Sequence, residues 1–180
     1  NGKERARAYG EALLKTVRAC SELMVNGVIA QGGNMSPVEK AQSLRGAVGI
    51  FDSVFPDGNY GVHHAYSARV YSLLSVYLWS DGRKDEAFEA LENALAQLMR
   101  CNEYCAKGTG YTAPLVRMVK CDFDYDGADD DSRPRVSCGS LVSDWPWWRV
   151  PEESAVRPEI QADPRWNEWA AKARACDKES

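Results

Sequence analysis

The fold is decided between Tyr66 and Leu98, where the chain reads YSARVYSLLSVYLWSDGRKDEAFEALENALAQL. In the first half, apolar or small side chains recur at steps of three and four residues, and the second half repeats this rhythm. Ser80-Asp81-Gly82 separates the halves, and Gly82 can adopt the left-handed conformation that often ends a helix. The stretch therefore predicts two helices joined by a tight turn. Their facing stripes are Ala68, Tyr71, Leu74, Ser75, Leu78, Ala87, Leu91, Ala94, Leu95 and Leu98.

The spacing of large and small side chains in this pair resembles one tetratricopeptide repeat (TPR) unit. The small residues Ser75, Ala87 and Ala94 would let the two helix axes approach closely. The Pro that usually closes the motif is missing, and any antiparallel helix pair needs small side chains against large ones. A TPR-like unit and a generic helical hairpin therefore remain alternatives. They differ in whether neighbouring pairs stack in one sense to form a groove.

Length and composition place the chain among ordinary globular proteins. It has 180 residues, enough for one domain with a sizeable core, and 44% of them are hydrophobic against 27% charged. A formal net charge of −4 argues against this segment itself holding a phosphate backbone, which needs a basic face. No apolar run approaches the ~20 residues that span a bilayer, so no membrane segment is expected. We expect a single helical domain over residues 1–180.

The cysteines and the first residues favour a cytoplasmic location. The sequence holds six cysteines but no Cys-x-x-Cys pair, and the charged start NGKERARAYG lacks the apolar core of an export signal. Cys20, Cys101 and Cys105 fall on apolar helical stripes, where thiols behave as small hydrophobes. We therefore expect reduced thiols in a cytoplasmic protein. A start at Asn1 rather than Met is what a piece of a longer chain would show.

Periodicity and capping signals predict the remaining helices. Ser36-Pro37-Val38-Glu39 has the form of a capping box, in which Ser36 caps the helix and Glu39 bonds back to it. Asp163-Pro164 is a similar start signal for the last helix. About five helices are expected in an all-α, TPR-like antiparallel array, over residues 3–24, 37–55, 62–80, 84–105 and 164–176.

Two stretches lack a clear period. Residues 122–135 are acidic and are expected to form a flexible loop. Residues 136–160 hold Trp145, Trp147, Trp148 and several prolines, and we expect them to form an irregular cover over the helices, pinned by these tryptophans.

Several features together resemble the C-terminal helical domains of bacterial helix-turn-helix (XRE-type) transcriptional regulators. The resemblance implies a non-enzymatic effector-binding or dimerisation domain, a homodimer, and contact with DNA only through an N-terminal module that this chain lacks. The Trp145–Trp148 stretch matches no part of that pattern, so the resemblance names no ligand. The residues that carry it are Tyr60, His63-His64, the Tyr71–Ala94 pair, Tyr111-Thr112-Ala113-Pro114-Leu115, Ile160 and Asp163-Pro164-Arg165-Trp166.

Part of the acidic loop resembles a calcium-binding loop. Asp122-x-Asp124-x-Asp126-Gly127 has the alternating oxygen ligands and the glycine of an EF-hand loop. However, Arg133 stands where the closing bidentate carboxylate is needed, so a solvated acidic loop is the favoured interpretation. No metal site and no cofactor are expected.

The histidines and possible nucleophiles give no catalytic set. His63 and His64 are the only histidines, and neighbours on a helix point about 100° apart, so both cannot bind one metal. Packing or capping at a helix start is the favoured interpretation. No nucleophile motif and no phosphate-binding glycine loop occur, so no catalytic residues are expected.

The remaining candidate is a binding surface. In a TPR-like pair the first helix faces the groove, and Arg69, Ser72, Val76 and Trp79 lie off its packing stripe. Trp79 could anchor a peptide or small-molecule effector, or it could instead contact the next helix or the Trp-rich stretch. The expected function is a regulatory domain of a bacterial transcriptional regulator. The alternative is a free-standing scaffold that binds a partner peptide in the groove.

Overall fold

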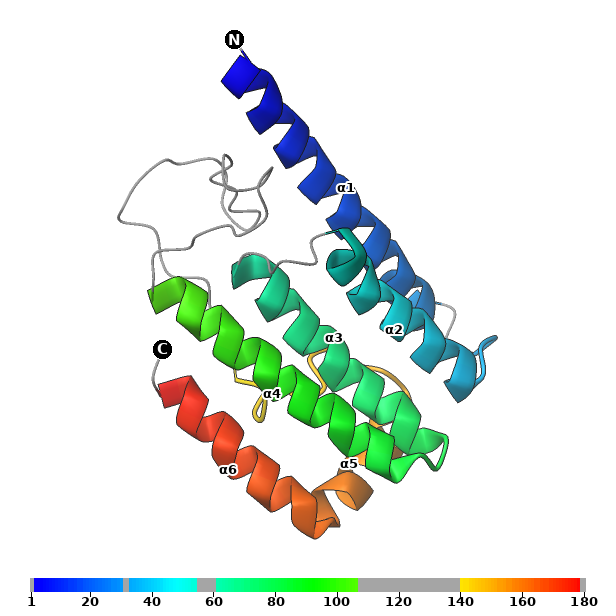
Figure 1. Cartoon of the computed structure of the whole chain (residues 1–180). Coiled ribbons are helices and arrows are strands. Elements are labelled where there is room, and N and C mark those ends of the chain that lie inside the picture. Colours follow the sequence, from blue (N-terminus) through cyan, green and yellow to red (C-terminus); the bar gives the residue numbers. More distant parts are fainter. Residues whose placement is uncertain (1, 31–32, 55–60, 107–139, 179–180) are drawn as a thin grey trace.

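Six α-helices and no strand occupy the residues that the computed structural model describes, which are 2–30, 33–54, 61–106 and 140–178. The all-α class predicted from the sequence is confirmed. The α1 and α2 helices lie side by side, α3 lies between α2 and α4, and α6 runs along the far side of α4 (Figure 1). The helices are α1 (Gly2–Ala30), α2 (Pro37–Val54), α3 (Gly61–Ser80), α4 (Lys84–Ala106), α5 (Glu153–Ala162) and α6 (Pro164–Lys178).

The predicted helix starts are made by the expected side chains. The Ser36 N–H donates to Glu39 Oε2 at 2.8 Å, and the Glu39 N–H donates to Ser36 Oγ at 3.3 Å, which completes the capping box of α2. At the start of α6, Asp163 Oδ1 accepts the Arg165 N–H at 3.0 Å. Each bond satisfies an amide that has no partner within its own helix.

The turn between α3 and α4 has the geometry that Gly82 predicts. Gly82 has φ +76°, and its N–H donates to Trp79 O at 2.9 Å. The Arg83 N–H reaches back to Leu78 O at 2.9 Å. This pair of bonds is the Schellman arrangement, which ends a helix at a left-handed residue and closes its last carbonyls.

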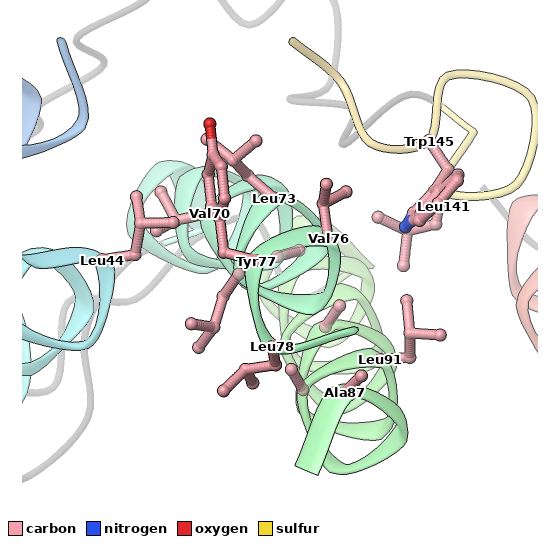
Figure 2. Packing of buried hydrophobic residues seen from close by; sticks show 14 of the residues in the cluster. Leu44, Val70, Leu73, Val76, Tyr77, Leu78, Ala87, Leu91, Leu141 and Trp145 are labelled. Atoms are coloured by element: carbon pink, nitrogen blue, oxygen red, sulfur yellow. The ribbon is translucent and has the colours of Figure 1, made fainter. Parts of the chain in front are cut away.

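The core is centred on α3, which is buried almost all round. Figure 2 shows Leu44 of α2 against one side of α3, and Leu141 and Trp145 against the other. Val70 and Val76 are fully buried on this helix. A helix that is apolar over most of its circumference is stable when neighbours cover every side, which is the position of α3.

The first helix is longer than predicted. The sequence placed its end near Met24 because Asn26-Gly27 is a turn signal, yet α1 continues to Ala30. Val25 and Val28 are buried in the core on either side of that dipeptide. Burial of these two side chains outweighs the local cost of a glycine in a helix, which is about 1 kcal/mol.

The Trp-rich cover is partly helical, so the prediction that 136–160 is irregular throughout was wrong. The α5 helix begins at Glu153 and continues through Pro158, with Val156 and Ile160 buried one turn apart. The prolines hid this helix from the sequence analysis. A spacing of four residues between two apolar side chains was the available signal.

Tryptophans fasten the cover and α6 to the hairpin of α3 and α4. The Trp145 Nε1–H donates to Ser75 Oγ at 3.1 Å, and the Trp169 Nε1–H donates to Leu91 O at 2.7 Å. Trp166 lies between them, with ring centroids 5.1 Å from Trp145 and 5.0 Å from Trp169. Buried indoles with satisfied N–H groups hold these segments in one position.

Candidate functional site

Three of the four residues predicted to line a groove are buried. Ser72, Val76 and Trp79 expose 5% of their surface or less, and Arg69 is half-buried. Ser72 Oγ donates to Ala68 O at 3.0 Å within the helix. The face of α3 that carries these residues is therefore covered in this structure. Their role in ligand binding stays a prediction.

The chain's own cover occupies this face. The Arg69 guanidinium lies over the Trp147 ring, with Cζ 3.9 Å from the ring centroid. The Trp79 Nε1–H donates to Glu159 Oε2 of α5 at 2.9 Å, and its ring meets Phe88 of α4 edge-on at 6.1 Å. Trp79 thus makes the contacts with the next helix and the cover that the sequence analysis gave as its alternative role.

A pocket of about 630 Å³ opens within the cover itself. Its accessible lining is more polar than apolar, and three tryptophans contribute to it: Trp145 is buried, while Trp147 and Trp148 are half-exposed. Pockets that bind small molecules commonly have this size. Its lining residues are Ser143, Asp144, Trp145, Pro146, Trp147, Trp148, Arg149, Glu153 and Arg157.

Trp147 holds a strained backbone in this pocket. Its φ is +80°, and it is the one non-glycine residue with positive φ among the described residues. Such a conformation costs roughly 1–3 kcal/mol for a bulky side chain, and residues of this kind concentrate at functional sites. The conformation places the Trp147 ring over the Arg69 guanidinium. The strain therefore marks the pocket as a candidate site.

Of the four charged residues that line the pocket, two form an ion pair with each other and two form none among the described residues. Arg157 bonds Glu153 and also donates to the Trp145 carbonyl, so its guanidinium is fixed within the wall. Among the described residues, the carboxylate of Asp144 accepts one long bond of 3.2 Å, from the Ser140 N–H. Arg149 forms no ion pair within the described part of the chain. The exposed carboxylate of Asp144 and the exposed guanidinium of Arg149 are thus available to a ligand.

A second hollow of about 680 Å³ lies between α4 and α6. Phe88 supplies its apolar surface, and Arg165 lies over that ring, with Cζ 4.3 Å from the centroid. Arg165 also bonds Asp85 and Asp163, and its bonds to the Asp163 carboxylate hold the pKa of Asp163 down to about 2. The one arginine here is already neutralised, and the remaining wall is mainly acidic. This hollow is a solvated surface that joins two helices.

A buried ion pair connects the cover to α2. Lys40, which is 2% exposed, donates to Glu152, the residue that precedes α5. The Lys40 ammonium also lies over the Tyr77 ring, 5.0 Å from its centroid. Burial, with a smaller effect of the Glu152 charge, raises the pKa of the Tyr77 hydroxyl far above its ordinary value. Tyr77 is therefore neutral at any physiological pH.

His64 is buried, and Cys101 and Cys176 pack in or against the core. The Nδ1 atom of His64 lies 2.6 Å from Gln97 Oε1 of α4. Cys20, Cys101 and Cys176 are thiols without a disulfide bond. Among the described side chains, no group of three or more His, Cys, Asp or Glu residues is arranged to hold a metal ion. None of the described helices combines the length and the apolar character needed to cross a membrane.

Some sequence predictions fall outside the described residues. These are the calcium-like loop Asp122–Arg133, the acidic stretch 122–135, Cys121 and Cys138, Tyr60 and the Tyr111–Leu115 segment. The side chains of His63 and Cys105 lie outside them as well.

The sequence did not predict the residues that line the pocket within the cover, which we call the Trp pocket. It identified Trp145, Trp147 and Trp148 as an unexplained stretch but gave no role to Asp144, Arg149 or Glu153 beside them. The available signal was the clustering of three indoles with charges of both signs in a dozen residues. Comparisons of the chain with protein-family models, with curated proteins and with solved structures found no match.

Proposed function

We propose that this chain is a non-enzymatic effector-binding domain of a bacterial transcriptional regulator, and that its effector binds in the Trp-lined pocket. The observation that carries the proposal is the pocket itself, about 630 Å³ in volume, with three indoles in its wall and a strained residue, Trp147, among them. The regulator part rests on the sequence resemblance, which also implies a homodimer and a separate DNA-binding module.

The contacts around the pocket give a route by which a ligand could act on the rest of the domain. Glu153 lines the pocket, and its neighbour Glu152 bonds the buried Lys40 of α2. In turn, Ser21 of α1 donates to the Ala47 carbonyl of α2. A ligand that prefers one position of the cover would therefore favour one position of α2 and α1. In a regulator, α1 is the helix nearest to a module placed before residue 1.

A thermal-shift screen of metabolites tests the effector part of the proposal. A ligand that binds only the folded state must raise the Tm, by an amount that grows with its concentration. Trp148→Leu should abolish that rise, because it removes an indole from the pocket wall. Tyr9→Leu is the matched control, since Tyr9 is 60% exposed on α1 and lies outside the pocket lining. A hit that binds both variants equally would place the site elsewhere.

The reading frame upstream of Asn1 tests the regulator part. A helix-turn-helix module encoded there supports a transcriptional regulator. A reading frame that starts without such a module would rule out the proposal of a transcriptional regulator. A scaffold that binds a partner peptide would then be the better proposal.

A further inference from the structure

The chemistry of the Trp pocket indicates what kind of molecule it would take, and the inference rests on the proposed function. The chain repeatedly pairs an aromatic face with a cation of its own. Arg157 lies over the Trp145 ring at 5.2 Å, and Arg69 lies over the Trp147 ring at 3.9 Å. Trp148 has no such cation within the described part of the chain. The Trp148 ring packs against the core with part of its surface and is half-exposed, so its exposed part can contact an apolar group.

Two charged side chains of the pocket are left without an ion pair among the described residues, one negative and one positive. Glu153 and Arg157 neutralise each other, and the Arg157 guanidinium is further held by the Trp145 carbonyl. This leaves the carboxylate of Asp144 and the guanidinium of Arg149, which are both exposed and both line the pocket. A purely anionic ligand would use Arg149 but would be repelled by Asp144. A purely cationic ligand would meet the reverse problem.

We propose that the pocket binds a small zwitterion, namely a free amino acid with an apolar side chain. Its ammonium group pairs with Asp144, its carboxylate pairs with Arg149, and its side chain packs on the Trp148 indole. A guanidinium is well suited to this role, because its fork of N–H donors matches the two oxygens of a carboxylate. The apolar side chain gains from removal of its surface from water against an indole.

Isothermal titration of the 180-residue chain tests the proposal with four forms of each probe. The probes are leucine, methionine, phenylalanine and tryptophan. Each is used as the free amino acid, as the N-acetyl acid, as the amide and as the N-acetyl amide. These forms carry both charges, the negative charge only, the positive charge only, and neither charge. At least one free amino acid should bind, and blocking either end should weaken its binding by about tenfold to a hundredfold, as expected for loss of a hydrogen bond to a charged group.

Variants assign each charge to its residue. Asp144→Asn keeps an acceptor for the Ser140 N–H but removes the negative charge. It should weaken the free amino acid and the amide, and leave the N-acetyl acid unchanged or bound more tightly. Arg149→Gln removes the partner of the carboxylate, so it should weaken the free amino acid and the N-acetyl acid, and leave the amide unchanged or bound more tightly. Asp52→Asn and Arg174→Gln are the matched controls, since both residues are exposed on helices and outside the pocket lining.

The outcomes separate this inference from the proposed function. Tight binding of the free amino acid alone, lost in Asp144→Asn and in Arg149→Gln, supports the zwitterion. Equal binding of all four forms, or binding of none, overturns it. If another metabolite raises the Tm in a manner that depends on Trp148, the pocket still binds an effector and only the zwitterion is wrong. If no metabolite raises the Tm in this way, both the zwitterion inference and the proposed effector-binding function fail.

Discussion

Lys40 and Glu152 form an ion pair between side chains that are 112 residues apart in the chain. The two partners differ in burial, because Lys40 is 2% exposed and Glu152 is 25% exposed. The pair joins the first turn of α2 to the residue before α5. The pair bonds the cover directly to α2.

Removal of the carboxylate should cost more than removal of the amine. Glu152→Gln leaves an uncompensated ammonium in the core, and breaking a buried pair in this way costs about 3–5 kcal/mol of unfolding free energy. Lys40→Met leaves the Glu152 carboxylate without its partner, and Oε2 of that carboxylate is already buried without a hydrogen bond to any described residue. The Glu152 side chain is still 25% exposed and methionine fills the buried space, so we expect a smaller cost of about 1–3 kcal/mol. Urea unfolding of both variants measures the difference.

An exposed pair serves as the control for this prediction. Lys172 contacts Glu168 and Glu92 on the surface and is 48% exposed. Lys172→Met should change the unfolding free energy by about 0.5 kcal/mol or less. If Glu152→Gln is no more destabilising than this control, Lys40 is hydrated rather than buried against Glu152.

Trp145 and Ser75 should be coupled in a double-mutant cycle. Ser75→Ala leaves the buried indole N–H of Trp145 without its acceptor and should cost about 1–3 kcal/mol. Trp145→Phe removes the donor and part of the ring. The double variant should be more stable than the sum of the single effects predicts, by about 1 kcal/mol. Additive effects would mean that the hydrogen bond contributes nothing.

Trp79→Ala should strongly destabilise the protein in the absence of any ligand. The indole is 5% exposed, bonds Glu159 and contacts Phe88, so its removal leaves a cavity. Truncation of a buried tryptophan typically costs about 3–5 kcal/mol. A variant of nearly unchanged stability would instead fit the sequence prediction of an exposed groove residue. Thermal unfolding of the free protein distinguishes these results.

The sequence predicts the fold where local signals and burial agree. Gly82 ends α3 and Ser36 starts α2 as expected, because each signal acts through hydrogen bonds within a few residues. Prediction fails where tertiary contacts outweigh a local preference. The α1 helix continues past the Asn26-Gly27 turn signal because Val25 and Val28 are buried in the core. Similarly, α5 remains helical although it contains Pro158.

The candidate site could be predicted only in part. The sequence identified Trp79 and Arg69 as residues off the packing stripe of α3, but it could not tell that the cover lies on them. That contact joins Arg69 to Trp147 and Trp79 to Glu159, across about eighty residues of chain. Helical periodicity describes one element at a time, so such pairings between distant segments are invisible to it.

Stability should fall in acid partly through Glu86. Bonds from Arg83 and Arg45 lower the pKa of Glu86 from 4.5 to about 2 in the folded state. A carboxylate whose folded pKa lies below its unfolded pKa stabilises the fold above the unfolded value. That stabilisation is lost as the pH falls from about 4.5 toward 2. The Tm of Glu86→Gln should therefore be lower than that of the parent at pH 7, and the difference should vanish near the bottom of this range.

Glu89→Gln is the control for that titration. Glu89 lies on the same helix and is exposed, and it forms no ion pair within the described residues. Its Tm should follow that of the parent at every pH. If Glu86→Gln also does so, the two arginines hold Glu86 too weakly to matter.

Two glycine-to-alanine substitutions should change stability in opposite directions. Gly82 has φ +76°, a conformation that costs an L-residue about 1–2 kcal/mol, so Gly82→Ala should destabilise the protein although no atom blocks the new methyl group. Gly49 lies within α2, where a Cβ would meet nothing within 4 Å. Gly49→Ala should stabilise the protein by about 0.5–1 kcal/mol, because alanine loses less backbone entropy in a helix. Urea unfolding compares the two, and changes of the same sign would contradict the backbone conformation described for one of the two glycines.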